Sequence, residues 1–158
     1  MLPTGHPADA LALPGEPPIQ ATLIDAGNPT VVVDARALGL SGVEMQSDVN
    51  GNTALLARCE RIRACAAVMM GLAPSVEAAT RERPATPMLA FVAAPRPYRA
   101  ANGRAIDAAM IDVAARMLSM GQLHHALPGT GGGALAVACA LPGTVAHAAA
   151  STPDGAGD

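Results

Sequence analysis

The sequence predicts one domain of the mixed α/β or α+β class, with strands arranged around a helix of small residues. Two runs rich in β-branched residues, 19–26 and 30–35, flank a Gly-Asn-Pro turn and are typical of strands. A segment from about Gly131 to Leu141 is apolar on every side, which indicates a helix enclosed by protein. The chain of 158 residues is long enough for one domain, which should bury roughly 70% of its unfolded surface.

The N-terminal part of the chain supplies the expected strands. Residues 1–18 are rich in proline and glycine and should form an extended N-terminal segment. The strands at 19–26 and 30–35 come next, and residues 37–44 form a turn-rich connection after them.

The clearest helical pattern lies between Thr53 and Met70. Its apolar residues recur at spacings of three and four, while its arginines lie on other sides. Thr53 is a suitable N-cap, and Gly71 can end the helix. The apolar positions are Leu55, Cys59, Ile62, Ala66 and Met69.

The second half of the chain is expected to alternate loop, strand and helix. Residues 75–87 are polar and predict a loop, and residues 88–95 predict an apolar strand. Apolar residues at helical spacing predict a second amphipathic helix over 105–118. The domain is expected to cover residues 19–148, and residues 149–158 should form a disordered tail.

The charged residues exclude some kinds of function. All ten basic residues are arginines, so no mechanism that needs a lysine base or a lysine Schiff base can operate within this chain. The formal charge is −3 and the arginines are dispersed. Nucleic acid is therefore not an expected partner, because no basic stripe is present to neutralise phosphates.

The apolar segments and the cysteines indicate a soluble, cytoplasmic protein with no membrane partner. The longest unbroken apolar run, Ala134–Leu141, is shorter than the roughly 20 residues that a bilayer requires. The N-terminus lacks the basic and apolar regions of a signal peptide. Cys59, Cys65 and Cys139 are odd in number and have no CxxC spacing, so we expect buried free thiols in a reducing compartment.

Two adjacent histidines, His124 and His125, precede a cluster of glycines. Neighbouring side chains point to opposite sides of a strand and diverge by about 100° on a helix, so two such imidazoles rarely share an ion. No Asp, Glu or Cys stands at ligand spacing nearby, and we expect no metal site. For at least one of these side chains, hydrogen bonds that hold a turn are the plainer interpretation.

The glycine cluster, residues 129–133, leaves two interpretations open. It lacks the lysine of a phosphate-binding P-loop and the βαβ setting of a dinucleotide site. The free N–H groups at the start of the following helix can hold a carboxylate, and glycine lets an anion approach the backbone closely. Alternatively, the glycines simply let the helix pack closely against strands.

The Asn-Pro step at Asn28 also has two interpretations. Asn-Pro between two strands marks a turn, and this alone explains most such steps. An asparagine side chain at the end of a strand can also hold the carboxylate or amide of a ligand. Spacing does not decide between them.

Four segments, in the same order, resemble a known enzyme family. They are "LPTG" (2–5), "IDAGNPTVVVDARALGLSGVE" (24–44), "RIRACAAVMMGLA" (61–73) and "ARMLSMGQLHHALPGTGGGALAVACALPGTV" (115–145). Together they are similar to the family of 2-methylaconitate cis–trans isomerase and 4-oxalomesaconate tautomerase. The resemblance implies an α+β structure: one lobe of a diaminopimelate epimerase-like fold, with a mixed sheet wrapped around a central apolar helix.

A more distant resemblance, to diaminopimelate epimerases, indicates site residues. Those enzymes carry a Gly-Asn-Pro whose asparagine binds substrate, and Asn28 occupies that position here. They also carry Glu-Arg-Gly, seven residues and then Gly-Thr-Gly, and residues 119–121 and 129–131 match that spacing. Pro128 stands where the epimerases have a catalytic cysteine, so their two-thiol mechanism is not available here.

The resemblance covers most of the second lobe only. Relatives transfer the proton with a lysine, helped by a cysteine, and both lie in the first lobe; this chain has no lysine. We therefore expect no catalytic residue in this chain. Its expected partners are a small carboxylate substrate and either the first lobe of the same enzyme or another copy of the chain. A truncated reading frame, a split subunit and a degenerate remnant are all compatible with the sequence.

The implied reaction is a cofactor-free 1,3-allylic proton shift on an unsaturated di- or tricarboxylate of the 2-methylaconitate or 4-oxalomesaconate type. No cofactor and no metal are expected. The alternative function is a non-catalytic remnant or a self-associating lobe without a ligand. The residues expected to bind and polarise the substrate carboxylates are Asn28, Ser119, Met120, Thr130, Gly131 and Gly132, with His124 supporting them.

Overall fold

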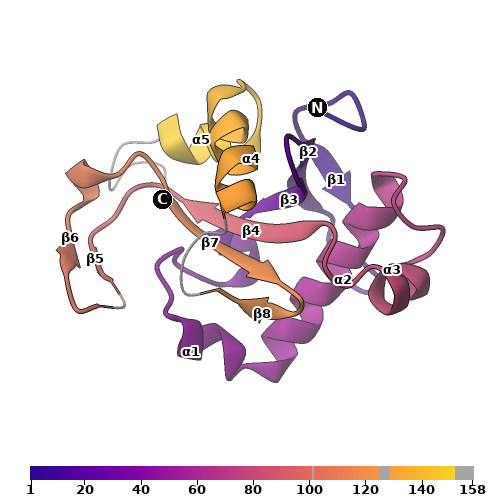
Figure 1. The fold of residues 1–158 in the computed structure, drawn as a ribbon, viewed down its shortest axis with the longest axis horizontal. Helices are drawn as coiled ribbons and strands as arrows, with labels where there is room; N and C mark the ends of the chain where they lie inside the picture. The colour runs from indigo at the N-terminus through magenta and orange to yellow at the C-terminus, as the bar shows by residue number, and fades with distance from the viewer. Residues whose placement is uncertain (101, 125–128, 152–158) are drawn as a thin grey trace.

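The computed structural model describes residues 1–100, 102–124 and 129–151, and its centre is a six-stranded sheet with strand order β1-β2-β3-β4-β7-β8. Neighbouring strands are antiparallel except β3 and β4, which are parallel. β5 and β6 form a separate two-stranded arm that projects from one side (Figure 1). The strands are β1 (Asp9–Leu11), β2 (Ile19–Asp25), β3 (Pro29–Asp34), β4 (Met88–Ala93), β5 (Tyr98–Arg99), β6 (Ala105–Ile106), β7 (Ala114–Ser119) and β8 (Gln122–Leu123).

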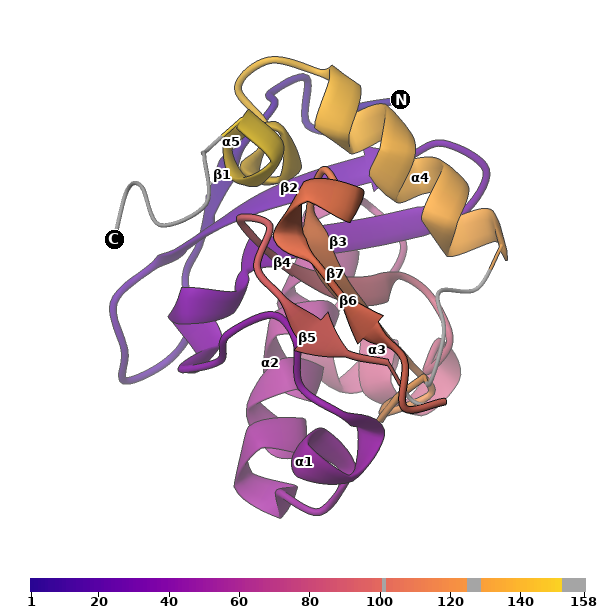
Figure 2. The ribbon, with the colours of Figure 1, turned by 90° about the vertical axis from the view of Figure 1, so that its left-hand side faces the viewer.

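Helices cover both faces of the sheet, which confirms the expected α+β class (Figures 1 and 2). α1, α2 and α3 all belong to the connection between β3 and β4, and α2 packs on one face. α4 and α5 pack on the opposite face. The helices are η1 (Ala35–Leu38), α1 (Gln46–Asn50), α2 (Thr53–Met69), α3 (Val76–Glu82), η2 (Ala108–Met110), α4 (Gly129–Ala140) and α5 (Val145–Ser151), where η denotes a short 3-10 helix.

The central strands contribute to two separate cores because successive residues of a strand point to opposite faces. Val31 and Val33 pack in the same core as Ile62 of α2, whereas Val32 packs in the same core as Leu135 of α4. Both faces of β3 are therefore covered, which explains its run of three valines.

The expected apolar helix is α4, and it packs on the sheet through one side. Ala134 and Ala138 are buried, while Gly133, Ala136 and Ala140 are exposed. A helix with no polar side predicts burial, but its sequence does not show what covers each side. Within the described residues, the outer side of α4 is uncovered.

α2 is the helix predicted from residues 53–70. Its N-cap is Asn52, whose side-chain oxygen accepts a hydrogen bond from Leu55 N–H at 3.0 Å, and the expected cap at Thr53 is wrong. Asparagine and threonine both cap helices, so the sequence did not decide between neighbours. Gly71 follows the helix with a φ of 75°, the left-handed conformation that favours glycine at a helix end.

The helix predicted over residues 105–118 is wrong, because this segment forms β6, η2 and β7. Its apolar residues Ile106, Met110 and Val113 lie on β6, on η2 and just before β7, and Met110 is 53% exposed, so their helical spacing does not mark one buried face. Leu118 of β7 packs in the core beneath α2, and the preceding Met117 packs beneath α4. A strand buried on both faces lacks the polar–apolar alternation that identifies strands, so its pattern resembles that of a helix.

The sequence predicted none of the shorter helical segments, and α3 and α5 lie within segments that it predicted to be a loop and a partly disordered end. α3 falls within residues 75–87 and begins after Ser75, whose hydroxyl accepts a hydrogen bond from Ala78 N–H at 3.1 Å. Its buried residues are alanines, which are too small to give a marked apolar pattern. The end of α5 includes residues 149–151, which were assigned to the tail; residues 152–158 lie outside the described residues.

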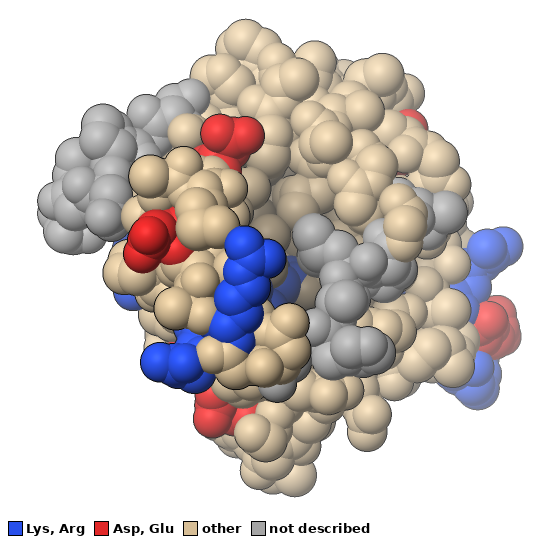
Figure 3. All heavy atoms as spheres, turned by 60° about the vertical axis from the view of Figure 1, so that its left-hand side comes forward, with Lys and Arg blue, Asp and Glu red and all other residues tan. Residues whose placement is uncertain are grey.

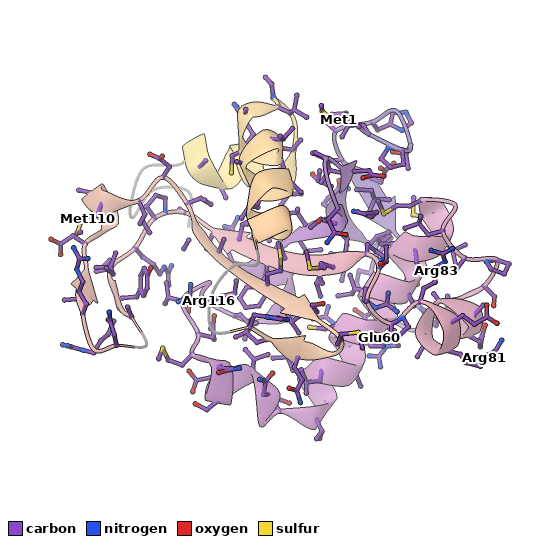
Figure 4. The ribbon with its side chains drawn as sticks, in the orientation of Figure 1. Met1, Glu60, Arg81, Arg83, Met110 and Arg116 are labelled. Atoms are coloured by element: carbon purple, nitrogen blue, oxygen red, sulfur yellow. The ribbon has the colours of Figure 1, made fainter. Side chains whose placement is uncertain are left out.

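A buried arginine joins α2 to α3 on the side of the molecule where Figure 4 labels Glu60 and Arg83. Arg63 is 3% exposed, and its guanidinium donates two hydrogen bonds to the Glu60 carboxylate at 2.7 and 2.8 Å. It also donates to the carbonyl oxygens of Ala79, Arg83 and Thr86. These bonds use every N–H of the guanidinium, so the buried charge has no unsatisfied donor.

We expect Arg63→Met to lower the free energy of unfolding by about 3–5 kcal/mol, because it leaves Glu60 and three carbonyl groups without their donor. Urea unfolding measures the loss. Arg61→Met, at an exposed position of the same helix, is the matched control and should change stability by less than about 0.5 kcal/mol. Equal losses in the two variants would contradict a stabilising role for the Arg63 network.

Candidate functional site

Two adjoining hollows lie around β7 and β8. The larger has a volume of about 520 Å3 and lies between β7, β5 and residues 44–47. The smaller has a volume of about 300 Å3 and lies at the turn between β7 and β8. Gln46, Leu123 and His124 line both, so the hollows share a wall. Figure 3 shows a recess beside the arm, on a face where basic and acidic side chains are interspersed.

The turn between β7 and β8 brings three of the predicted site residues together. Ser119, Met120 and His124 all line the smaller hollow. Ser119 pairs with Gln122, and the two residues between them have positive φ: 53° at Met120 and 78° at Gly121. A two-residue turn of this kind favours Asn or Gly at both positions. Met120 is therefore held in a strained conformation, with its side chain 63% exposed.

Asn50 of α1 holds β8 in place, and the sequence did not indicate this role. Its side-chain oxygen accepts from Leu123 N–H at 2.7 Å, and its side-chain nitrogen donates to the Leu123 carbonyl at 3.3 Å. The backbone N–H of His124 donates to the Met117 carbonyl at 3.0 Å. These contacts fix the position from which His124 enters both hollows. His125 lies outside the described residues.

Asn28 lies at the same end of the sheet as Ser119 but does not line either hollow. Thr30 at the start of β3 pairs with Met88 at the start of β4, and Leu89 pairs with Leu118 near the end of β7. Two strand spacings therefore separate the turn at Asn28 from the end of β7, a distance of about 10 Å.

The start of α4 lies over this same end of the sheet, and Gly131 is closely packed there. A Cβ at Gly131 would overlap Met117 Sδ and lie 2.8 Å from Met88 Cε, whereas a Cβ at Gly132 would meet nothing within 4 Å. Close packing therefore explains the glycine at 131, while no atom of the described residues fills the space above Gly132. Thr130 belongs to the first turn of α4, and its side chain lies outside the described part of the structure.

Arg116 lines the larger hollow, and the sequence reasoning missed it because it assigned β7 to a helix. It lies between β7 and α1 in Figure 4. Its Nε donates to the Glu44 carbonyl and its Nη1 to the Ala115 carbonyl, both at 2.8 Å. Its guanidinium carbon is 5.0 Å from the centre of the Tyr98 ring, a cation–π contact.

The Glu44 carboxylate also lines the larger hollow, but it is bound by its own loop. It accepts hydrogen bonds from the Ser41 N–H, the Ser41 hydroxyl and the Gly42 N–H at 2.8 to 2.9 Å. Burial acts to raise the pKa of Glu44, and these hydrogen bonds outweigh it, so that the pKa is lowered from its ordinary value. Glu44 is therefore ionised at neutral pH and closes the loop before α1.

None of the three thiols lines either hollow, and the described residues form no metal site. Burial raises the pKa of Cys59 to about 11, and burial raises the pKa values of Cys65 and Cys139 as well. The three thiols are free and protonated at neutral pH. Among the described residues, no three His, Cys, Asp or Glu side chains are grouped so that they could hold a metal ion.

Comparison with known proteins agrees with this arrangement. The sequence pattern of the PrpF protein family matches residues 1–156. The chain belongs to this family. It is 45% identical over 151 residues to a 2-methyl-aconitate isomerase of Shewanella oneidensis, and 31% identical over 157 residues to a (4E)-oxalomesaconate Delta-isomerase of Novosphingobium. These alignments cover 95% and 99% of this chain.

The fold is also that of a solved member of this group. The crystal structure of a methylitaconate-delta-isomerase superposes on 94% of this chain with a TM-score of 0.91 and 34% identity. The family resemblance and the fold expected from the sequence are therefore confirmed. This chain spans 38% of that structure, and 38% and 37% of the two relatives. No helix in the described part of the chain is long and apolar enough to cross a membrane.

We expect Gly131→Ala to be less stable than Gly132→Ala by about 1–3 kcal/mol, because only the first inserts a methyl group into a filled space. Both variants gain about 1 kcal/mol of helix propensity, so the comparison isolates the packing term. Thermal and urea unfolding measure the difference. Equal stabilities would mean that Met88 and Met117 move aside without cost.

We expect Glu44→Gln to be less stable than the native chain by about 1–2 kcal/mol at pH 7, after allowance for solvent screening. The pKa of Glu44 is lowered in the folded chain, so its stabilising effect is complete above its ordinary value of 4.5 and is lost as pH falls through the folded value. Urea unfolding from pH 7 to pH 3 should show the difference shrinking. Asp112→Asn, which removes an exposed carboxylate outside the helices, is the control; a difference that stays constant with pH would contradict the assignment.

Proposed function

We propose that this chain is part of an isomerase or tautomerase of unsaturated di- or tricarboxylates, of the 2-methylaconitate or 4-oxalomesaconate type. The observation that carries the proposal is the match of residues 1–156 to the PrpF protein family, whose relatives bear isomerase names. The meeting of Ser119, Met120 and His124 at one hollow supports it.

The proposed reaction is a 1,3-allylic proton shift. A base removes a proton from the carbon next to a carboxylate-conjugated double bond, the double bond moves by one position, and the proton returns at the far carbon. Negative charge spreads onto the conjugated carboxylate between these two steps. Hydrogen-bond donors placed at that carboxylate stabilise the charge and therefore speed the reaction.

In this scheme the chain binds the substrate and does not supply the base. The Ser119 hydroxyl and the N–H groups of Thr130 and Gly132 are donors for carboxylates, and Asn28 binds at the same end of the sheet. Met120 packs against the carbon skeleton, and His124 supports the wall shared by the hollows. The chain contains no lysine, so the base comes from the first lobe of the same enzyme or from another chain. The reaction as proposed needs no cofactor and no metal.

A second candidate function is that of a self-associating lobe without a ligand. The exposed, uncharged outer side of α4 favours it, because such a surface is usually covered by another protein surface. Sedimentation tests this alternative, because a clean monomer at high concentration would contradict self-association.

We expect the purified chain to bind trans-aconitate without isomerising 2-methylaconitate or 4-oxalomesaconate. Binding to the folded state alone raises stability by about 2.7 kcal/mol at a hundredfold excess over Kd, which a melting experiment detects. Asn28→Ala should weaken binding by about 1.5–3 kcal/mol, through loss of a hydrogen bond to a charged group.

Gly132 offers a matched pair of variants for the same experiment. Gly132→Asp places a negative charge at the start of α4, where it suits the helix dipole but repels a carboxylate, so the chain should stay folded and lose protection. Gly132→Ala occupies the same open space without charge and should retain protection. A folded chain whose melting temperature does not respond to trans-aconitate would overturn the binding proposal, and clear turnover by the chain alone would overturn the assignment of the base to another part.

A further inference from the structure

The guanidinium of Arg116 is fixed in position but keeps hydrogen-bonding capacity. Its Nε and Nη1 each donate to a backbone carbonyl, and the Tyr98 ring lies against its face. Its Nη2 donates to no described residue, and no carboxylate of the described residues forms an ion pair with it. The charge is therefore held at the hollow without an anionic partner from the described chain.

Glu44 is the acidic residue in the lining that could pair with Arg116, but its carboxylate is already hydrogen-bonded within its own loop. Its two carboxylate oxygens accept the three hydrogen bonds from Ser41 and Gly42. Arg116 instead contacts Glu44 through the backbone carbonyl. Glu44 therefore contacts the guanidinium through its backbone carbonyl, while its carboxylate binds Ser41 and Gly42 within its own loop. The edge of the guanidinium that carries Nη2 remains available for an anion.

The rest of the hollow suits a carboxylate that is attached to an apolar skeleton. The side chains of Gln46, Ser47 and His124 line the hollow and make no hydrogen bond with the described residues. Val113 and Leu135 line it as well and supply apolar walls. A volume of about 520 Å3 is large enough for a small organic acid.

We infer that the larger hollow is a carboxylate subsite in which Arg116 binds one carboxylate of the substrate. The inference rests on the proposed function, because it assigns one carboxylate of the proposed substrate to the larger hollow. The shared wall of Gln46, Leu123 and His124 lets one molecule extend from Arg116 to the turn at Met120. Arg116 selects substrates that carry a carboxylate at this end, and Tyr98 positions the guanidinium.

The geometry requires an arginine and not merely a positive charge. A guanidinium can bind two backbone carbonyls and still offer a planar edge to a carboxylate, whereas an ammonium group has three donors on a flexible stem. The face of Tyr98 restricts the guanidinium plane, and this contact needs the ring but not the hydroxyl.

Isothermal titration of the 158-residue chain with trans-aconitate, succinate and acetate tests the inference. Arg116→Gln should lower trans-aconitate affinity by about 10- to 100-fold, the loss expected for a hydrogen bond to a charged group. Arg116→Lys should recover only part of it. Arg104→Gln removes the same charge from an exposed position on the arm and should stay within about threefold, with a difference that vanishes in salt.

The Tyr98 variants separate positioning from simple structural support. Tyr98→Phe should bind trans-aconitate as the native chain does, while Tyr98→Leu should bind it more weakly. In the Tyr98→Leu background, arginine and lysine at position 116 should give the same trans-aconitate affinity. Melting curves of every variant without ligand show that the fold is kept.

The possible outcomes distinguish this inference from the proposed function. If Gly132→Asp abolishes trans-aconitate binding and Arg116→Gln leaves it unchanged, the subsite is overturned and the proposed function stands. If acetate and succinate bind as tightly as trans-aconitate, and all depend on Arg116, the subsite stands and the proposed substrate class is overturned. A folded native chain that binds none of the three acids overturns both the subsite and the proposal that this chain binds the substrate.

Discussion

The parallel pairing of β3 with β4 determines where the other elements can lie. A parallel pair cannot be joined by a tight hairpin, so the chain must cross from one end of the sheet to the other before β4 begins. That crossing carries α1, α2 and α3, and it places α2 on one face of the sheet. The antiparallel strand β7 then runs back in the opposite direction. The turn at Asn28, the start of β4 and the end of β7 therefore lie at the same end of the sheet.

The polar side chains of the candidate site come from elements around this end of the sheet and not from the apolar helix. α4 contributes small residues that let it lie directly on Met88 and Met117, together with the backbone amides at its start. β7, β8 and α1 contribute the side chains that line the hollows. The helix thus covers this end of the sheet, and the side chains that line the hollows belong mainly to the strands and to the short helix beside them.

Much of this arrangement follows from the sequence, and the exceptions have physical causes. β2, β3, β4 and α2 were predictable because each is long and has a consistent apolar pattern. β7 was mistaken for part of a helix because Met117 follows Met110 and Val113 at helical spacing. Met117 and Leu118 are also buried on opposite faces, which removes the alternation of a strand. The family resemblance led to Ser119 and Met120, and the two residues do meet at a hollow.

Arg116 was missed for a related reason. Its place beside Tyr98 and Glu44 depends on three segments that are far apart in the chain, and no local pattern encodes that meeting. The same is true of Asn50, whose pairing with Leu123 joins residues 73 positions apart. A sequence shows which side chains are available for a site, while the crossing of the chain decides which of them become neighbours.

The positive φ of Met120 has a consequence for how this protein can change. A glycine at that position would release roughly 1–2 kcal/mol of backbone strain, so selection for stability alone favours losing the methionine. Under the proposed function, in which Met120 contacts the substrate, the turn is a place where stability and binding oppose each other. Engineering this chain for heat resistance by placing a glycine at this turn would therefore remove a side chain of the candidate site.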